Sequence, residues 1–134
     1  MGTIWWEEGL EVPAEAAWAW LRRVHLAHEL FAPVLVDGRI DGEIRTVTFA
    51  DGLVVRERIV DLDEARRRVA YTVLDGLFEH HAASMQIVPV DARSCRFLWI
   101  TDFLPTDRAA MVRPLVEQGS RALARNIASR ARPA

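Results

Sequence analysis

Glu79, His80 and His81 are adjacent in the sequence, and side chains of these types can bind a metal ion, transfer protons or occupy ordinary strand positions. A turn signal precedes them and alternating apolar residues follow, which predicts a strand. Adjacent strand residues point to opposite faces, so the two histidines cannot bind one metal ion together, and no metal site is expected. His81 shares the parity of Met85 and Ile87. It is therefore expected to face the interior as an acid, a base or a ligand contact.

Three further polar residues share the inward parity of predicted strands. Glu57 is either the ion-pair partner of an inward arginine such as Arg45 or an acid or base in an apolar pocket. Tyr71 is either a core residue with a satisfied hydroxyl or a hydrogen-bond donor to a ligand carbonyl. The catalytic candidates are therefore His81 and Glu57 as acid–base groups, with Tyr71 and Arg45 as donors to a carbonyl or oxyanion.

Turn signals divide the chain into elements. A strand at 3–12 is followed by a helix that begins at Pro13 and by a second short helix at 25–31. Turn dipeptides such as Asp51-Gly52 then separate strands at 34–40, 44–50, 53–62, 68–74, 80–90 and 95–104. A long helix at 106–130 has an apolar stripe, which predicts an α+β fold with a curved antiparallel sheet over that helix. A sheet wrapped around one helix commonly leaves an internal cavity that holds a ligand.

Strand parity and the helical stripe identify the side chains expected to contact such a ligand. They are Val47, Phe49, Leu53, Val55, Ile59, Val73, Met85, Phe97, Trp99, Val116, Gly119 and Leu123. Asp61 also has inward parity. Leu98 and Ile100 point outward, either as scattered surface residues or as the contact of a homodimer.

The composition bounds the class of protein. With 134 residues and a net charge of −2, the chain fits one globular domain over 1–134, and its scattered arginines do not indicate nucleic-acid binding. No apolar run reaches the ~20 residues of a membrane span, and no signal-peptide pattern is present, which predicts a cytoplasmic protein. A lone cysteine excludes an intrachain disulfide. The sequence has no lysine, which excludes Schiff-base catalysis by that side chain, and no cofactor is expected.

An ordered set of short segments is spread along nearly the whole chain. The set is Val12-Pro13 with Trp18, Gly42-x-x-Arg45-Thr46-Val47, Asp51 to Ile59 with Leu62-Asp63, Tyr71-Thr72-Val73, Asp75-Gly76, Phe97-x-Trp99 and the terminal helix. This set resembles the START-like (SRPBCC) superfamily, in particular its polyketide cyclase/dehydrase branch, which is related to the plant abscisic-acid receptors.

The resemblance implies a helix-grip fold, with seven antiparallel strands around the C-terminal helix and a deep cavity between them. In the receptors, the loop matching 51–53 acts as a gate over the cavity and the loop matching 76–81 as its latch. Here Val54 replaces the gate proline, and there is no lysine to hold a hormone carboxylate. Hormone sensing is therefore not expected.

Two functions follow from the cavity and the resemblance. The first is a cyclase, aromatase or dehydratase that orients a poly-β-keto or aromatic intermediate and moves an α-proton, without a metal or a covalent lysine intermediate. The second is a non-catalytic protein that carries or senses a hydrophobic small molecule.

Overall fold

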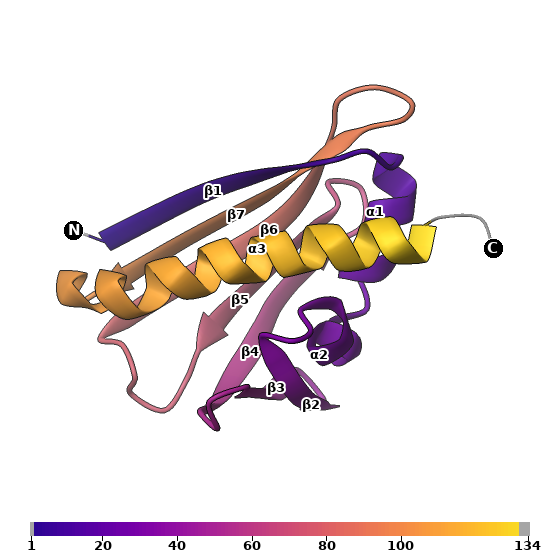
Figure 1. Ribbon diagram of the computed structural model, residues 1–134. Coiled ribbons are helices and arrows are strands. Elements are labelled where there is room, and N and C mark those ends of the chain that lie inside the picture. The colour runs from indigo at the N-terminus through magenta and orange to yellow at the C-terminus, as the bar shows by residue number, and fades with distance from the viewer. Residues whose placement is uncertain (1, 132–134) are drawn as a thin grey trace.

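The computed structural model describes residues 2–131. Their seven strands form one antiparallel sheet in the order β1-β7-β6-β5-β4-β3-β2 (Figure 1). The strands are β1 (Gly2–Leu10), β2 (Leu35–Asp41), β3 (Ile44–Phe49), β4 (Val54–Asp63), β5 (Arg68–Val73), β6 (His80–Pro89) and β7 (Cys95–Leu104). The helices are α1 (Ala14–Leu21), the 3₁₀ turn η1 (Val24–Leu26), α2 (Ala27–Leu30), the 3₁₀ turn η2 (Thr106–Arg108) and α3 (Ala109–Ala131).

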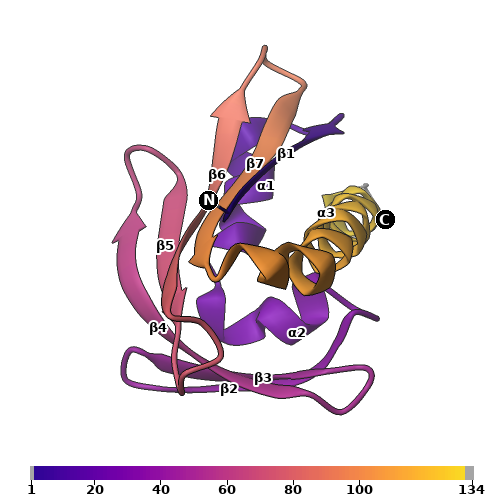
Figure 2. The ribbon, with the colours of Figure 1, turned by 90° about the vertical axis from the view of Figure 1, so that its left-hand side faces the viewer.

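The sheet curves around α3, as the view along that helix shows (Figure 2). β2 and β3 close one side of the curve, β6, β7 and β1 close the other, and α2 lies in the concave space between β2 and α3. This arrangement confirms the predicted helix-grip fold. It also places the inward strand faces opposite one stripe of a single helix.

The stripe on α3 follows the predicted helical spacing. Val112, Val116, Leu123 and Ile127 are buried on it. The sequence predicts one helix from residue 106, whereas the structure has the separate turn η2 followed by α3, with Pro114 in the helix interior. Period-3.6 burial of these four residues fixes the helix against the sheet.

One irregularity in β4 changes which side chains face inward. The pairing of β4 with β5 shifts register between Ile59 and Asp61, so a bulge interrupts the alternation at Val60. Past the bulge, Asp61 is exposed and Leu62 packs against the core. The inward parity predicted for Asp61 is therefore wrong, because a bulge adds one residue to the period of two.

The outer face of the sheet carries a small apolar group. Leu98 and Ile100 are half-buried there, and Trp5, the cross-strand neighbour of Ile100, has 60% of its surface exposed. The homodimer contact stays a prediction.

The second predicted helix, 25–31, is shorter in the structure, where η1 is followed by the four-residue α2. A helix of this length leaves its last carbonyl groups without intrahelical partners. Asn126 of α3 supplies the missing donor, since its side-chain amide donates to the carbonyl oxygens of Leu30 (2.8 Å) and Ala32 (2.9 Å). The segment that leads into β2 is thereby joined to α3.

We expect the substitution Asn126→Ala to lower the free energy of unfolding by about 1–3 kcal/mol, because it leaves two partly buried carbonyls without their donor. Chemical denaturation measures this loss. Arg125→Ala, on the exposed side of the same helical turn, is the control and should change stability by under about 0.5 kcal/mol. Equal denaturation midpoints for the two variants would show that the amide does not anchor this segment.

Candidate functional site

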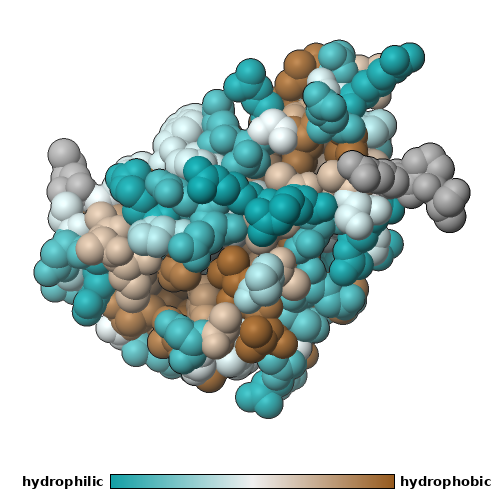
Figure 3. Space-filling model, viewed as in Figure 1, coloured by the Kyte–Doolittle hydropathy of each residue, from teal (hydrophilic) through white to brown (hydrophobic). Residues whose placement is uncertain are grey.

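A cavity of about 100 Å³ lies between the concave face of the sheet and the N-terminal half of α3. Figure 3 shows a hollow lined by hydrophobic residues beside that helix. The partly exposed lining residues, which include Leu53, Phe78 and Leu115, mark the mouth, whereas Val47 and Met85 are buried in the interior. The wall is overwhelmingly apolar, so its few polar groups determine what the cavity can do chemically.

The charged groups of the wall form an ion pair between Arg45 of β3 and Glu57 of β4. The two residues are direct cross-strand partners, and Arg45 Nε donates to Glu57 Oε1 at 2.9 Å. Only 8% and 11% of their side-chain surfaces are exposed. Arg45 Nη1 also donates to the carbonyl oxygen of Val24 at 3.1 Å. Both charges are thus removed from water and compensate one another.

Tyr71 of β5 lies next to this pair, with the Arg45 guanidinium 5.7 Å from the centre of its ring. Its hydroxyl oxygen accepts a hydrogen bond from Trp99 Nε1 at 3.1 Å. Burial, and then the charge of Glu57, raise the pKa of the Tyr71 hydroxyl. The residue therefore keeps its proton at neutral pH and can donate it in a hydrogen bond.

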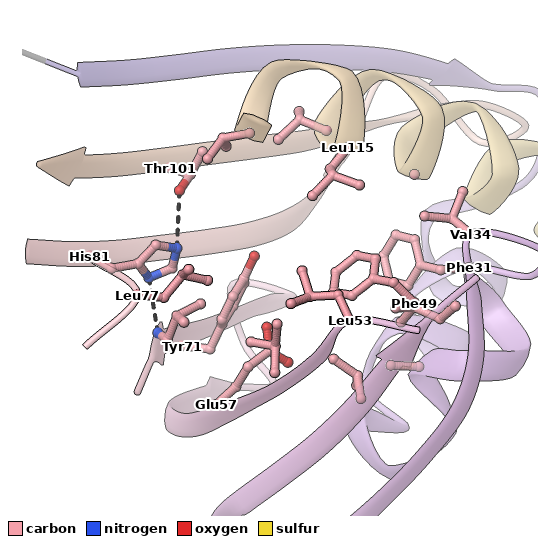
Figure 4. A pocket seen from close by; sticks show the side chains of 18 of the residues that line it. Phe31, Val34, Phe49, Leu53, Glu57, Tyr71, Leu77, His81, Thr101 and Leu115 are labelled. Atoms are coloured by element: carbon pink, nitrogen blue, oxygen red, sulfur yellow. Dashed lines mark hydrogen bonds between the residues drawn. The ribbon is translucent and has the colours of Figure 1, made fainter. Parts of the chain in front are cut away.

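His81 of β6 faces the cavity, as predicted from parity, while His80 is exposed. Its Nδ1 accepts a hydrogen bond from the Val73 backbone N–H at 3.0 Å, and its Nε2 lies 3.3 Å from Thr101 Oγ1 (Figure 4). An acceptor at Nδ1 places the proton of the neutral ring on Nε2, which then donates to Thr101. Burial lowers the pKa of His81 to about 4, with His80 adding to the shift and Asp102 opposing it.

This arrangement makes His81 a weak acid–base group. Both ring nitrogens are engaged, and a base with so low a pKa binds protons poorly at neutral pH. The imidazole instead links β5 to β7 across its own strand. The role of His81 as proton carrier stays a prediction.

Gly119 of α3 allows the aromatic part of the wall to approach the helix. A Cβ at this position would lie 3.0 Å from Trp99 Cζ3 and 3.6 Å from Phe31 Cδ1. The Phe31 and Trp99 rings pack together with centroids 5.7 Å apart. A larger residue at 119 would push Trp99, and with it the hydrogen bond to Tyr71, toward the cavity.

The loop between β5 and β6 brings Leu77 and Phe78 to the mouth. Asp75 and Gly76 both have positive φ angles, +66° and +74°, which reverse the chain sharply. Arg56 of β4 holds the turn through two hydrogen bonds to the Asp75 carboxylate, at 2.7 and 2.8 Å. An exposed ion pair thus positions two apolar side chains over the cavity.

The structure brings the four predicted catalytic residues, His81, Glu57, Tyr71 and Arg45, into one wall, and most of the predicted ligand contacts join them. The predicted contacts in the lining are Val47, Phe49, Leu53, Val55, Val73, Met85, Trp99, Val116 and Gly119. Ile59, Phe97 and Leu123 lie outside the lining and pack in the core, because they are farther along their elements than the cavity extends. The roles of all these residues stay predictions.

Sequence reasoning missed part of the wall. Phe31 and Val34 enter from the segment between α2 and β2, Leu35 from the start of β2, Leu77 and Phe78 from the β5–β6 loop, and Met111 from the first turn of α3. The strand and helix periods do not apply in loops, so parity could not find the loop residues. Runs of apolar residues beside turn signals, such as Leu77-Phe78 after Asp75-Gly76, were the available signal.

Residues 2–131 contain neither a group of metal-ligand side chains nor a membrane-spanning helix. Over that range, His, Cys, Asp and Glu side chains do not gather in groups of three or more that could hold a metal ion. The helices described there also lack the combined length and apolar character needed to cross a membrane.

The His81 environment predicts a pH dependence of stability. Between pH 6.5, the ordinary pKa, and about 4, the unfolded chain binds a proton that the folded protein does not, so stability falls as the pH falls. The difference corresponds to roughly 3 kcal/mol at 1.36 kcal/mol per pKa unit. We expect His81→Asn, which retains an acceptor but does not titrate, to lose less stability over this range in denaturant titrations.

His80→Asn serves as the matched control, because His80 is the exposed neighbour. It should keep most of the fall in stability, because it removes only the smaller contribution of His80 to the pKa shift of His81. If His81→Asn and His80→Asn gave the same profile, the buried imidazole would not be the group that destabilises the fold in acid.

Solved structures similar to this chain share the fold described above. XoxI of Bacillus cereus superposes with a TM-score of 0.87 at 14% identity, covering 99% of this chain and all of that one. The Zhui aromatase/cyclase of Streptomyces sp. R1128 gives 0.79 at 20% identity, with 96% and 92% of the two chains covered. Norcoclaurine synthase of Thalictrum flavum, in complex with dopamine and hydroxybenzaldehyde, gives 0.73 at 21% identity, with 95% and 84% covered.

No curated protein sequence matches the chain. The family model described as "polyketide cyclase / dehydrase and lipid transport" matches residues 9–132, nearly the whole length. This match confirms the resemblance predicted from the short segments. The chain therefore belongs to the polyketide cyclase/dehydrase and lipid transport family.

Proposed function

We propose that this protein binds a hydrophobic small molecule in the cavity between the sheet and α3. The observation that carries the proposal is an apolar cavity whose only charged lining residues in the described chain, Arg45 and Glu57, are paired with each other. Such a cavity favours ligands that gain from leaving water and have a polar end to satisfy. The family description, which names both catalysis and lipid transport, supports this class of ligand.

The size of the cavity sets a limit on the ligand. An engineered apolar cavity of about 150 Å³ is large enough for benzene, and this one has about 100 Å³. A single ring is thus about the largest group that the cavity holds without rearrangement. A larger ligand would extend through the mouth past Leu53 and Leu115.

A second candidate function is catalysis, and it is favoured by the polar groups that remain available. Glu57 Oε1 is taken by Arg45, while Oε2 has no hydrogen-bond partner within residues 2–131. In a cyclase or dehydratase, this oxygen would take the α-proton of a ketone. The Tyr71 hydroxyl would donate a hydrogen bond to the enolate oxygen, and the α-carbon would then attack a second carbonyl. The aromatase/cyclase among the similar structures supports this reading.

Filling the cavity tests ligand binding. Leu115→Trp places a large ring at the mouth, and we expect it to abolish or weaken at least tenfold the binding of a hydrophobic reporter dye measured by fluorescence titration. Gln118→Trp puts the same residue on the exposed side of α3 and should leave binding unchanged. Equal affinity of both variants for the dye would place its binding outside the cavity and contradict the proposal.

Hydrogen exchange at an activated carbon tests catalysis. Acetophenone is a single-ring ketone, and we expect the protein to accelerate deuterium incorporation at its methyl group, followed by NMR in D₂O. Tyr71→Phe should lose most of that acceleration, on the order of 10²-fold, because the enolate loses its donor. Binding of acetophenone without accelerated exchange would reject catalysis by these groups and leave the protein as a carrier or sensor.

A further inference from the structure

The charges in the cavity wall sum to zero. Arg45 and Glu57 form one ion pair, and the remaining lining residues among 2–131 are apolar, hydroxyl-bearing or, in the case of His81, neutral at physiological pH. Neither sign of charge is left over to balance a charged ligand. Transfer of an unpaired carboxylate or ammonium group into such a site carries a large desolvation penalty.

The hydrogen-bonding groups of the same wall, in contrast, are not all paired with one another. Glu57 retains one carboxylate oxygen as an acceptor, and Tyr71, whose oxygen already accepts from Trp99, retains its O–H as a donor. The Trp99 N–H is already engaged with Tyr71 and the Thr101 oxygen with His81, whereas Thr101 keeps its O–H and Arg45 keeps guanidinium N–H groups beyond those that bind Glu57 and Val24. One strong acceptor, Glu57 Oε2, and several donors, among them the Tyr71 O–H, are therefore available in the cavity wall.

Glu57 and Tyr71 are neighbours in the cavity wall. Glu57 pairs with Val73 and Ile59 pairs with Tyr71 across β4 and β5, so Glu57 and Tyr71 are diagonal neighbours on the inward face. Diagonal neighbours are separated by about 7–8 Å or less, within reach of long side chains. Both side chains line the cavity, and Figure 4 shows them directed toward it.

We propose that the ligand of this cavity is an uncharged molecule with a hydroxyl group, an alcohol or phenol, which donates to Glu57 and accepts from Tyr71 while its apolar body extends toward the mouth. A hydroxyl is the smallest neutral group that is both donor and acceptor. The inference rests on the proposed function and adds to it the chemistry of the ligand head. It excludes fatty acids and other free carboxylates.

Four single-ring probes separate the contributions of the hydroxyl group, the apolar ring and the ligand charge to binding at neutral pH. They are p-cresol, 4-methylanisole, toluene and p-toluate. They share a methyl-substituted ring and differ in one group, which is a hydroxyl, a methyl ether, hydrogen or a carboxylate. Titration calorimetry or ligand-observed NMR measures their dissociation constants. We expect p-cresol to bind roughly 10- to 100-fold more tightly than 4-methylanisole and toluene, since a hydrogen bond to a charged group contributes about that factor. p-Toluate should bind most weakly.

The outcomes distinguish the two proposals. Equal binding of the three neutral probes, or binding of p-toluate as tight as that of p-cresol, would overturn the hydroxyl assignment and leave hydrophobic binding intact. Absence of binding by all four would overturn the proposed function itself. The expected ranking, abolished in Leu115→Trp, supports both.

A charge substitution provides the sharper test. Glu57→Gln removes the carboxylate and leaves the Arg45 charge unbalanced, so the preference should shift by at least tenfold toward p-toluate. Asp75→Asn makes the same change in charge in the exposed pair with Arg56, at a positive φ that Asn tolerates, and should keep the original ranking. An unchanged ranking in folded Glu57→Gln would contradict the charge argument.

If Glu57→Gln does not fold, the variant Tyr71→Phe tests the hydroxyl site instead. It removes the hydroxyl, and with it the acceptor of Trp99 Nε1, and retains the ring that packs in the wall. We expect the advantage of p-cresol over toluene to fall several-fold, while toluene binds as before. A full advantage in this variant would exclude Tyr71 from the hydroxyl site.

Discussion

The buried ion pair between Arg45 and Glu57 is the interaction on which the cavity depends. Each charge alone would be strongly unfavourable in so apolar a wall, and removal of one partner from such a pair typically costs about 3–5 kcal/mol. Because the residues are direct partners across β3 and β4, the sheet register itself holds them together. The second hydrogen bond of Arg45, to Val24, joins the sheet floor to the turn before α2. The pair thus fixes the shape of the closed end as well as its charge.

The space above the pair exists because other contacts keep the helix and the sheet from collapsing onto it. The tilted rings of Trp99 and Phe31 pack against each other and next to Gly119 of α3, so aromatic rings rather than aliphatic chains span the gap. Asn126 holds the segment that carries Phe31 by hydrogen bonds to two carbonyls. Rigid rings and fixed backbone at one end preserve a void that flexible side chains would fill, since protein interiors otherwise pack densely.

The sequence was informative where one period governs an element. Alternation in β3, β4 and β6 placed Arg45, Glu57 and His81 on the inward face, and the stripe on α3 placed Val116 and Gly119 opposite them. It failed at Asp61, where a bulge resets the alternation, and in the loops that supply Leu77 and Phe78. Distances between side chains could not be predicted from the sequence either. The engagement of both His81 nitrogens depends on the separation of β5 from β6, which no pattern of residue types encodes.

That separation has a consequence for association between chains. Regular pairing of β5 with β6 ends at Tyr71 and Ala83, beyond which the two strands would expose free backbone groups. Such groups can recruit a strand from another molecule and begin aggregation. Here the His81 ring accepts from the Val73 N–H, and the Thr72 hydroxyl donates to the His81 carbonyl at 2.6 Å. Side-chain hydrogen bonds thus replace backbone pairing where β5 and β6 separate. Fewer free backbone groups are left there for a strand of another molecule to pair with.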